Sequence, residues 1–215
     1  VTYCVATIGD AGFDTIEEAL KEAKDGDTIV LQRDITSSEI ITINKDITFD
    51  GNDHTLTSTA PRAINIDTTG DVVIKDLTIN AAERAINIIN KPATVTLTGV
   101  TATADNNAVM IATSAGAAKV TVENCDFTGL AVINVSGAGA QVTVAGSKIT
   151  NVDANADENY GAITVWTSAE GATVEVTNSE IVETQFFNMH GVRIDTPSKG
   201  AFIRIDKLAN GNKNV

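Results

Sequence analysis

Apolar residues recur along the chain in triplets of the form apolar, variable, apolar. One series starts at Ile41, and successive copies start 23, 22, 23, 24, 30 and 29 residues further on. Two copies, Arg62–Ile66 and Arg84–Ile88, have the same sequence. A fixed period of this length is typical of repeat proteins, in which each repeat is one structural unit. The copies of this first series are Ile41–Ile43, Ile64–Ile66, Ile86–Ile88, Val109–Ile111, Ile133–Val135, Ile163–Val165 and Val192–Ile194.

A second series of triplets runs between the first, with the same period. Most of its copies are followed, two residues later, by Gly, Asn or Asp, which tolerate the left-handed backbone of a tight corner. Beyond each corner an apolar residue returns. The second series is Ile29–Leu31, Ile47–Phe49, Val72–Ile74, Val95–Leu97, Val120–Val122, Val142–Val144, Val174–Val176 and Ile203–Ile205. The corners are Gly51, Asp76, Gly99, Asn124, Gly146 and Asn178, and the returning residues are Leu56, Ile79, Ala102, Phe127, Ile149, Ile181 and Leu208.

Both series together predict short strands separated by corners, repeated once per coil. A strand of three residues cannot bury its flanking residues alone, but stacked coils bury them in one column and pair each strand with its copies above and below. The middle residue of each triplet then faces outward. We therefore predict an all-β fold, a right-handed parallel β-helix (a solenoid) of about seven coils.

The N-terminal segment has the features of a cap for the open end of such a solenoid. Residues 2–8 suit a strand, and residues 14–24 suit a short helix with Asp14 as N-cap and Glu17 completing a capping box. The helix has one apolar stripe, which suits packing across the first coil. We predict a cap over 1–27 and a β-helix over 28–215, continuous as one domain, and expect the chain to be cut from a longer protein.

Two segments carry a resemblance to a known superfamily. Gly12–Leu20 with Gly26–Leu31, and Ile47–Leu56, resemble the opening of pectin-lyase-like β-helix proteins. The resemblance implies the β-helix fold over nearly the whole chain. It is closest in character to the pectate-lyase-like adhesive domains of bacterial surface proteins. The superfamily also includes lyases, hydrolases and esterases, so the resemblance alone does not assign an activity.

Composition indicates which residues form the core and which classes of partner and scaffold are excluded. Apolar residues make up 43 % of the chain and aromatics only 4 %, so the core is expected to consist of Val, Ile, Leu and Ala. The net charge of −13 argues against nucleic acid and anionic membranes, which require a basic surface. No apolar run is long enough to span a bilayer. Two cysteines, Cys4 and Cys125, exclude a disulfide-rich scaffold and leave a single bridge open.

The expected outward rows hold no pair of carboxylates. Hydrolysis of a polysaccharide needs two clustered carboxylates as acid and base, and a calcium-dependent lyase needs a carboxylate cluster beside a basic residue. Glu175 stands alone in its row, and no catalytic residue is assigned. The rows are Thr42, Asn65, Asn87, Met110, Asn134, Thr164, Arg193 and Thr48, Val73, Thr96, Thr121, Thr143, Glu175, Arg204.

The last two intervals of the first series are longer than the others. The extra residues fall at 151–161 and 183–191, equivalent places in successive coils, so we expect two excursions side by side. Five of the eleven Tyr, Trp, Phe and His residues fall within 31 positions here. Aromatic side chains of this kind either hold sugar rings or protein partners, or form a small satellite core. The candidate ligand-binding residues are Tyr160, Trp166, Phe186, Phe187 and His190.

The first excursion also contains the spacing Asp153, Asn155, Asp157, which is found in calcium loops. It lacks the glycine expected at the sixth position, where Glu158 stands, and the glutamate at the twelfth, where Thr164 stands. A solvated acidic loop is the simpler interpretation. Calcium is the one cofactor that the sequence suggests.

Two functions remain open at this point. The first is a non-catalytic β-helix module of a bacterial cell-surface or secreted protein, which binds a host or microbial glycan or a surface protein. The second is a lyase or glycoside hydrolase acting on uronic-acid-containing polysaccharide, with its site partly outside this chain. The absent carboxylate pairs favour the first.

Overall fold

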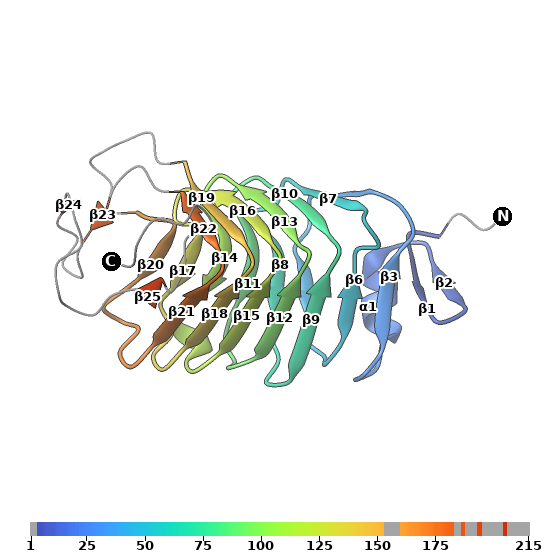
Figure 1. Cartoon of the computed structure of the whole chain (residues 1–215). Helices are drawn as coiled ribbons and strands as arrows, with labels where there is room; N and C mark the ends of the chain where they lie inside the picture. Colours follow the sequence, from blue (N-terminus) through green and yellow to red (C-terminus); the bar gives the residue numbers. More distant parts are fainter. Residues whose placement is uncertain (1–3, 153–159, 183–185, 188–192, 195–203, 206–215) are drawn as a thin grey trace.

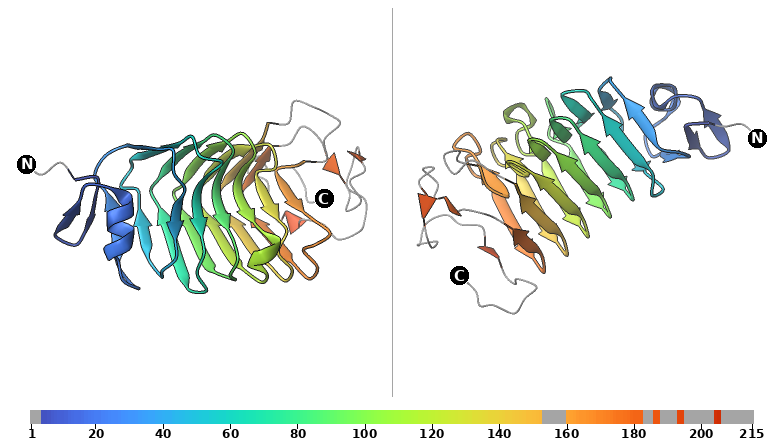
Figure 2. Two further views of the ribbon diagram at one scale, coloured as in Figure 1. Left: turned by 180° about the vertical axis from the view of Figure 1, so that it is seen from behind. Right: turned by 90° about the horizontal axis from the view of Figure 1, so that it is seen from above.

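The computed structural model describes residues 4–152 and 160–182, and the backbone of three two-residue strands at 186–187, 193–194 and 204–205. The chain forms a parallel β-solenoid of stacked coils with one short helix near its N-terminus (Figure 1). The coils follow one another along a straight rod, with the N-terminal cap at one end (Figure 2). The predicted fold class is therefore confirmed.

Three sheets run along the rod, and each complete coil contributes one strand to each. The first sheet contains β3 (Thr28–Leu31), β6 (Thr48–Asp50), β9 (Asp71–Lys75), β12 (Thr94–Thr98), β15 (Lys119–Glu123), β18 (Gln141–Ala145), β21 (Thr173–Thr177) and β25 (Arg204–Ile205). The second contains β4 (Ile35–Ser37), β7 (Thr55–Ser58), β10 (Thr78–Ala81), β13 (Thr101–Ala104), β16 (Asp126–Gly129), β19 (Lys148–Asn151) and β22 (Glu180–Val182). The third contains β5 (Ile41–Ile43), β8 (Arg62–Ile66), β11 (Arg84–Ile88), β14 (Asn107–Ile111), β17 (Ile133–Val135) and β20 (Ile163–Val165). A 3₁₀ turn, η1 (Thr113–Ala115), follows β14.

The number of coils is lower than the predicted seven. The third sheet has six strands in the described part of the chain, which span five complete turns. The seventh copy of the first series falls on β24 (Arg193–Ile194), which pairs antiparallel with β23 (Phe186–Phe187). Its backbone groups therefore bond within a hairpin and not to β20.

The register of the second series is confirmed from the second coil onward, since Val72 and Ile74 align with Val95 and Leu97 and with their copies above. The first coil differs, because Ile29 pairs with Phe49 rather than Ile47. A shift of two residues keeps every side chain on its own face of the strand, so the apolar pattern alone cannot distinguish the two registers. The flanking residues of most described triplets fill the interior, as predicted, but Val165 is 43 % exposed and Val174 is half-buried.

Most of the predicted corners have the expected backbone. Asp76, Gly99, Asn124, Gly146 and Asn178 all have positive φ, between 49° and 63°. Gly51 is the exception, because Asn52 and Asp53 take the positive φ values at that corner. The corners form one column along the rod, between the first and second sheets.

The N-terminal cap consists of β1 (Ala6–Ile8), β2 (Ala11–Phe13) and helix α1 (Ile16–Glu22). Strand β1 extends the first sheet antiparallel to β3. The predicted N-cap, Asp14, is wrong by one residue: the Thr15 hydroxyl accepts the hydrogen bond from the Glu18 backbone N–H. At the other end of α1, the Lys45 ammonium donates to the carbonyl oxygens of residues 20, 21 and 23, at 2.8, 2.8 and 2.5 Å.

Candidate functional site

The candidate site is an aromatic pair on the outside of the last complete coil. Trp166 follows β20 directly, and its backbone N–H donates to the Val135 carbonyl of the coil below. The Tyr160 and Trp166 rings meet edge to face, with centroids 6.1 Å apart and planes at 70°. Trp166 keeps 39 % of its surface exposed, close to the 43 % of its neighbour Val165. We call Tyr160 and Trp166 the aromatic pair.

Asn134 fixes the orientation of the indole. The Trp166 Nε1–H donates to Asn134 Oδ1 at 3.0 Å, across one coil and 32 residues of sequence. The same oxygen accepts from the Ser136 hydroxyl at 3.1 Å. Asn134 is buried, with 7 % of its surface exposed. The Asn134 side-chain oxygen is buried and accepts two hydrogen bonds, so its position is fixed. The tryptophan ring that donates to it therefore has one preferred orientation.

This arrangement leaves the ring, and not its N–H, as the group available to a ligand. A held aromatic ring gives a large apolar contact area at a small cost in conformational entropy. Sugar rings and protein side chains both pack on such surfaces. The site therefore offers an apolar surface for stacking.

The two predicted excursions leave from neighbouring strands. Strands β19 and β22 pair in register, Lys148 with Glu180 and Thr150 with Val182, and the excursions follow their ends. The interior of both excursions lies outside the described residues. The structure thus brings two of the candidate ligand-binding residues together, Tyr160 and Trp166. It describes Phe186 and Phe187 by their backbone in β23 only, while His190, Asp153, Asn155 and Asp157 lie outside the described residues.

The first outward row is less accessible than the sequence suggests. Asn65, Asn87 and Asn134 face outward but are buried, and Asn87 donates from Nδ2 to the Ile64 carbonyl of the coil below. In the second row, Thr143 and Glu175 are exposed. Asn87 therefore links two coils, Asn134 holds the Trp166 indole, and the Oδ1 atoms of Asn65 and Asn87 are buried without a hydrogen-bond partner among the described residues.

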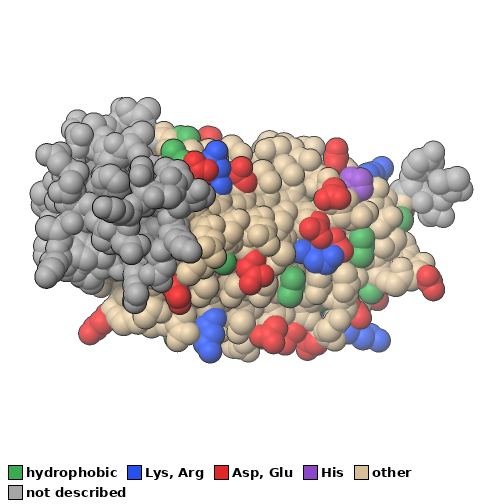
Figure 3. Space-filling view, viewed as in Figure 1, with side chains coloured by type: hydrophobic (Ala, Val, Ile, Leu, Met, Phe, Trp, Pro, Cys, Tyr) green, Lys and Arg blue, Asp and Glu red, His purple; other side chains and the backbone are tan. Residues whose placement is uncertain are grey.

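The remaining candidate groups are metal-binding clusters, thiols and charged surface side chains. Among the described residues, no group of three or more His, Cys, Asp or Glu side chains is placed to hold a metal ion. Cys4 and Cys125 are free thiols, so the single bridge that the sequence left open is not formed. On the face in Figure 3, charged side chains are scattered among uncharged polar ones, with acidic and basic groups close together in several places. The calcium site at residues 153–157 stays a prediction.

Sequence reasoning missed the role of Asn134. It placed Asn134 in the outward row but left it without a partner, because the excursion between Asn134 and Trp166 hides their register. The signal was present in the spacing of the triplets: Val135 and Val165 are equivalent, so Trp166 must follow β20 one coil above Ser136. That step would have placed the indole over the Asn134 column.

No protein-family model, curated protein or solved structure matches the chain. The described residues also contain no helix of the length and apolar character needed to cross a membrane.

Proposed function

We propose that this chain is a non-catalytic β-solenoid module of a bacterial cell-surface or secreted protein, and that it binds glycan through the aromatic pair. The observation that carries the proposal is the Trp166 ring, exposed yet held by a buried Asn134. Val165, directly before it, is also exposed at 43 %, so the hydrogen bond to the buried Asn134, and not exposure alone, distinguishes the Trp166 ring. A ring that is both fixed and accessible is suited to stacking on a sugar.

The resemblance to the adhesive domains of the pectin-lyase-like superfamily supports the same proposal. A solenoid is a rigid rod, and a binding group near one end of it is held away from whatever the other end adjoins. The acidic charge of the chain disfavours polyanionic glycans at a stacking site, so neutral glycans are the expected class.

The test is a glycan array with the protein and two variants. Trp166→Ala removes the exposed ring, and Trp166→Phe keeps a ring while removing the hydrogen bond to Asn134. Ile40→Ala is the matched control, because Ile40 is exposed to a similar extent, 37 %, and lies near the N-terminal end of the rod. We expect Trp166→Ala to abolish array binding, Trp166→Phe to weaken it and Ile40→Ala to leave it unchanged.

Two results would contradict the proposal. Unchanged array binding by a folded Trp166→Ala protein would remove the site from consideration. A large fall in the melting temperature of Trp166→Ala, without array binding by the parent protein, would assign the aromatic pair to packing. A separate screen on pectin and polygalacturonate, with and without calcium, tests the non-catalytic part, since turnover there would favour a lyase or hydrolase.

A further inference from the structure

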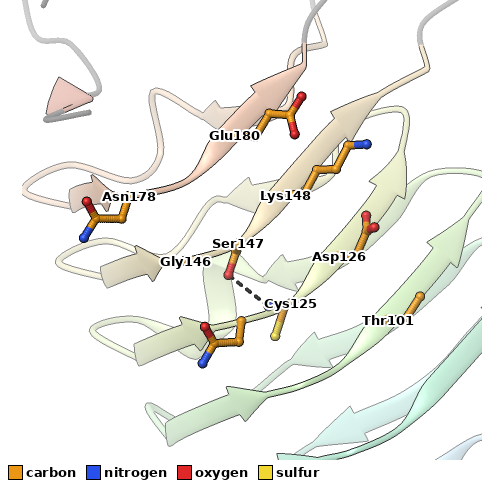
Figure 4. A pocket seen from close by; sticks show the side chains of 9 residues that line it. Thr101, Cys125, Asp126, Gly146, Ser147, Lys148, Asn178 and Glu180 are labelled. Atoms are coloured by element: carbon orange, nitrogen blue, oxygen red, sulfur yellow. Dashed lines mark hydrogen bonds between the residues drawn. The ribbon is translucent and has the colours of Figure 1, made fainter. Parts of the chain in front are cut away.

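A shallow polar hollow of about 380 Å³ lies at the corner between the first and second sheets, over β16, β19 and β22 and the first residue of β13, Thr101 (Figure 4). Its floor is formed by Cys125, Gly146 and Ser147. The carboxamide residues Asn124 and Asn178 line one side, at the left-handed corners. The other side is formed by the charged column, which we define as Asp126, Lys148 and Glu180.

The three residues of the charged column pair with one another in register, and they stand where earlier coils carry threonine. Asp126 pairs with Lys148, and Lys148 with Glu180, so carboxylate, ammonium and carboxylate follow one another coil by coil. Earlier coils carry threonine at the same position of the second sheet. The equivalent residues are Thr55, Thr78 and Thr101. The three charges thus stand where the earlier coils carry a β-branched residue, which is the residue type that strands favour.

The Lys148 ammonium forms no ion pair with the neighbouring carboxylates of the charged column. Lys75 and Lys91 form ion pairs with aspartates, Lys75 with Asp50 at 2.5 Å and Lys91 with Asp67 at 3.3 Å. Lys148 forms none within 4.0 Å among the described residues, although a carboxylate lies one coil away on each side. Its ammonium, like both carboxylates, is exposed and retains its hydrogen-bonding capacity.

The floor beneath these groups is rigid. The Ser147 hydroxyl accepts from the Cys125 N–H at 3.1 Å and donates to the Ala145 carbonyl at 2.8 Å. One coil further on, the Ser179 hydroxyl accepts from the Ser147 N–H at 3.1 Å and donates to the Thr177 carbonyl at 2.9 Å. This relay fixes the spacing of the strands that carry the charged column, so a ligand would meet a preorganised surface.

We propose that the hollow is a second binding site, for a single neutral sugar residue. A hydroxyl can accept from the Lys148 ammonium while it donates to a carboxylate or carboxamide beside it, so a vicinal pair of hydroxyls matches the alternating column. The column carries one net negative charge on a chain of net charge −13, which disfavours an anionic ligand. Because the hollow is shallow and open, it would contact one face of a single sugar ring and not enclose it.

This site is independent of the aromatic pair. The hollow lies where strands of the second sheet begin, whereas Trp166 follows the end of a strand in the third sheet. Either site can bind without the other, and the two proposals can fail separately.

The experiment is titration of the ¹⁵N-labelled protein with free galactose, mannose, glucose and N-acetylglucosamine, each followed by amide chemical shifts. We expect at least one sugar to shift the amides of residues 124–126, 146–148 and 178–180, with a Kd of about 1–10 mM. Lys148→Thr, which restores the residue type of the earlier coils, should raise that Kd by about tenfold or more, and Glu180→Gln should weaken binding in the same direction. Lys119→Thr is the matched control, because Lys119 is an exposed lysine at the start of β15, outside the hollow.

The results distinguish binding in the hollow from binding at the aromatic pair and from an effect of overall charge. Shifts confined to Tyr160, Trp166 and Asn134 would support the aromatic pair and overturn the proposal for the hollow. The absence of any shift around the hollow at sugar concentrations of about 50 mM would overturn it as well. Stronger binding of glucuronate than of glucose would overturn the preference for a neutral ligand. Equal losses of affinity in Lys148→Thr and Lys119→Thr would show that overall charge, and not the column, is responsible.

Discussion

The side-chain oxygen of Asn124 lies 2.7 Å from the point that a Cβ on Gly146 would occupy, one coil above it. Asp76 stands in the same relationship to Gly99, at 2.9 Å. The corner column therefore alternates between residues with an Asx side chain and glycine, because each Asx side chain occupies the space that the next coil leaves vacant. Positive φ explains why these residue types are found at corners, and this close approach explains their order.

We expect Gly146→Ala to destabilise the protein. The left-handed backbone at Gly146 costs about 1–2 kcal/mol for a residue with a Cβ, and the overlap with Asn124 adds to this. Urea denaturation of the two proteins measures the sum. Gly171→Ala is the control, because Gly171 also has positive φ but a Cβ there would have no neighbour within 4 Å. Equal losses in both variants would contradict the steric explanation. In an Asn124→Gly background, the cost of Gly146→Ala should fall to that of the control.

Cys125 takes the place of a serine in the relay of the corner. It is buried, and its thiol donates to the Glu123 carbonyl as the Ser147 hydroxyl does to the Ala145 carbonyl. Burial raises the pKa of the Cys125 thiol from 9.0 to about 11, against the smaller effect of the neighbouring backbone hydrogen bonds. Between these two pH values the unfolded thiol ionises while the folded one stays protonated, so the free energy of unfolding falls as pH rises.

We therefore expect Cys125→Ser to fold normally and to lose less stability than the parent protein between pH 9 and pH 11. The difference between the two should reach about 2 kcal/mol at the upper end, measured by urea denaturation at each pH. Identical pH profiles would contradict the assignment. Thiol labelling of the native protein gives an independent check: Cys4 is half-buried and should react first, and labelling of Cys125 should require unfolding.

Lys45→Met should loosen helix α1. The Lys45 ammonium binds three carbonyl groups at the C-terminal end of the helix, where a positive charge also interacts favourably with the helix dipole. We expect a loss of about 2 kcal/mol in local stability, seen as faster amide hydrogen exchange in α1. Lys24→Met removes an exposed lysine just beyond the helix and should leave the exchange rates unchanged. Slower exchange, or equal effects from both substitutions, would show that Lys45 does not cap the helix.

The local repeat determined most of the architecture. Triplets such as Ile64–Ile66 and Val95–Leu97 specify which side chains enter the core, because alternation along a strand is a property of the backbone itself. The same holds for the corners at Asp76 and Asn124, where the residue type reports the backbone conformation. These features depend on neighbours in the sequence, so they could be predicted without the structure.

What only the tertiary structure decided concerns contacts between coils. Three contacts depend on the number of residues in each coil. They are the pairing of Ile29 with Phe49, the hydrogen bond from Trp166 to Asn134, and the column of Asp126, Lys148 and Glu180. Insertions of variable length change the number of residues per coil without changing the alternation of apolar residues along each strand. The sequence therefore determined which face each side chain occupies. The stacking of the coils decided which residues from distant parts of the chain meet there, and both proposed binding sites are made of such residues.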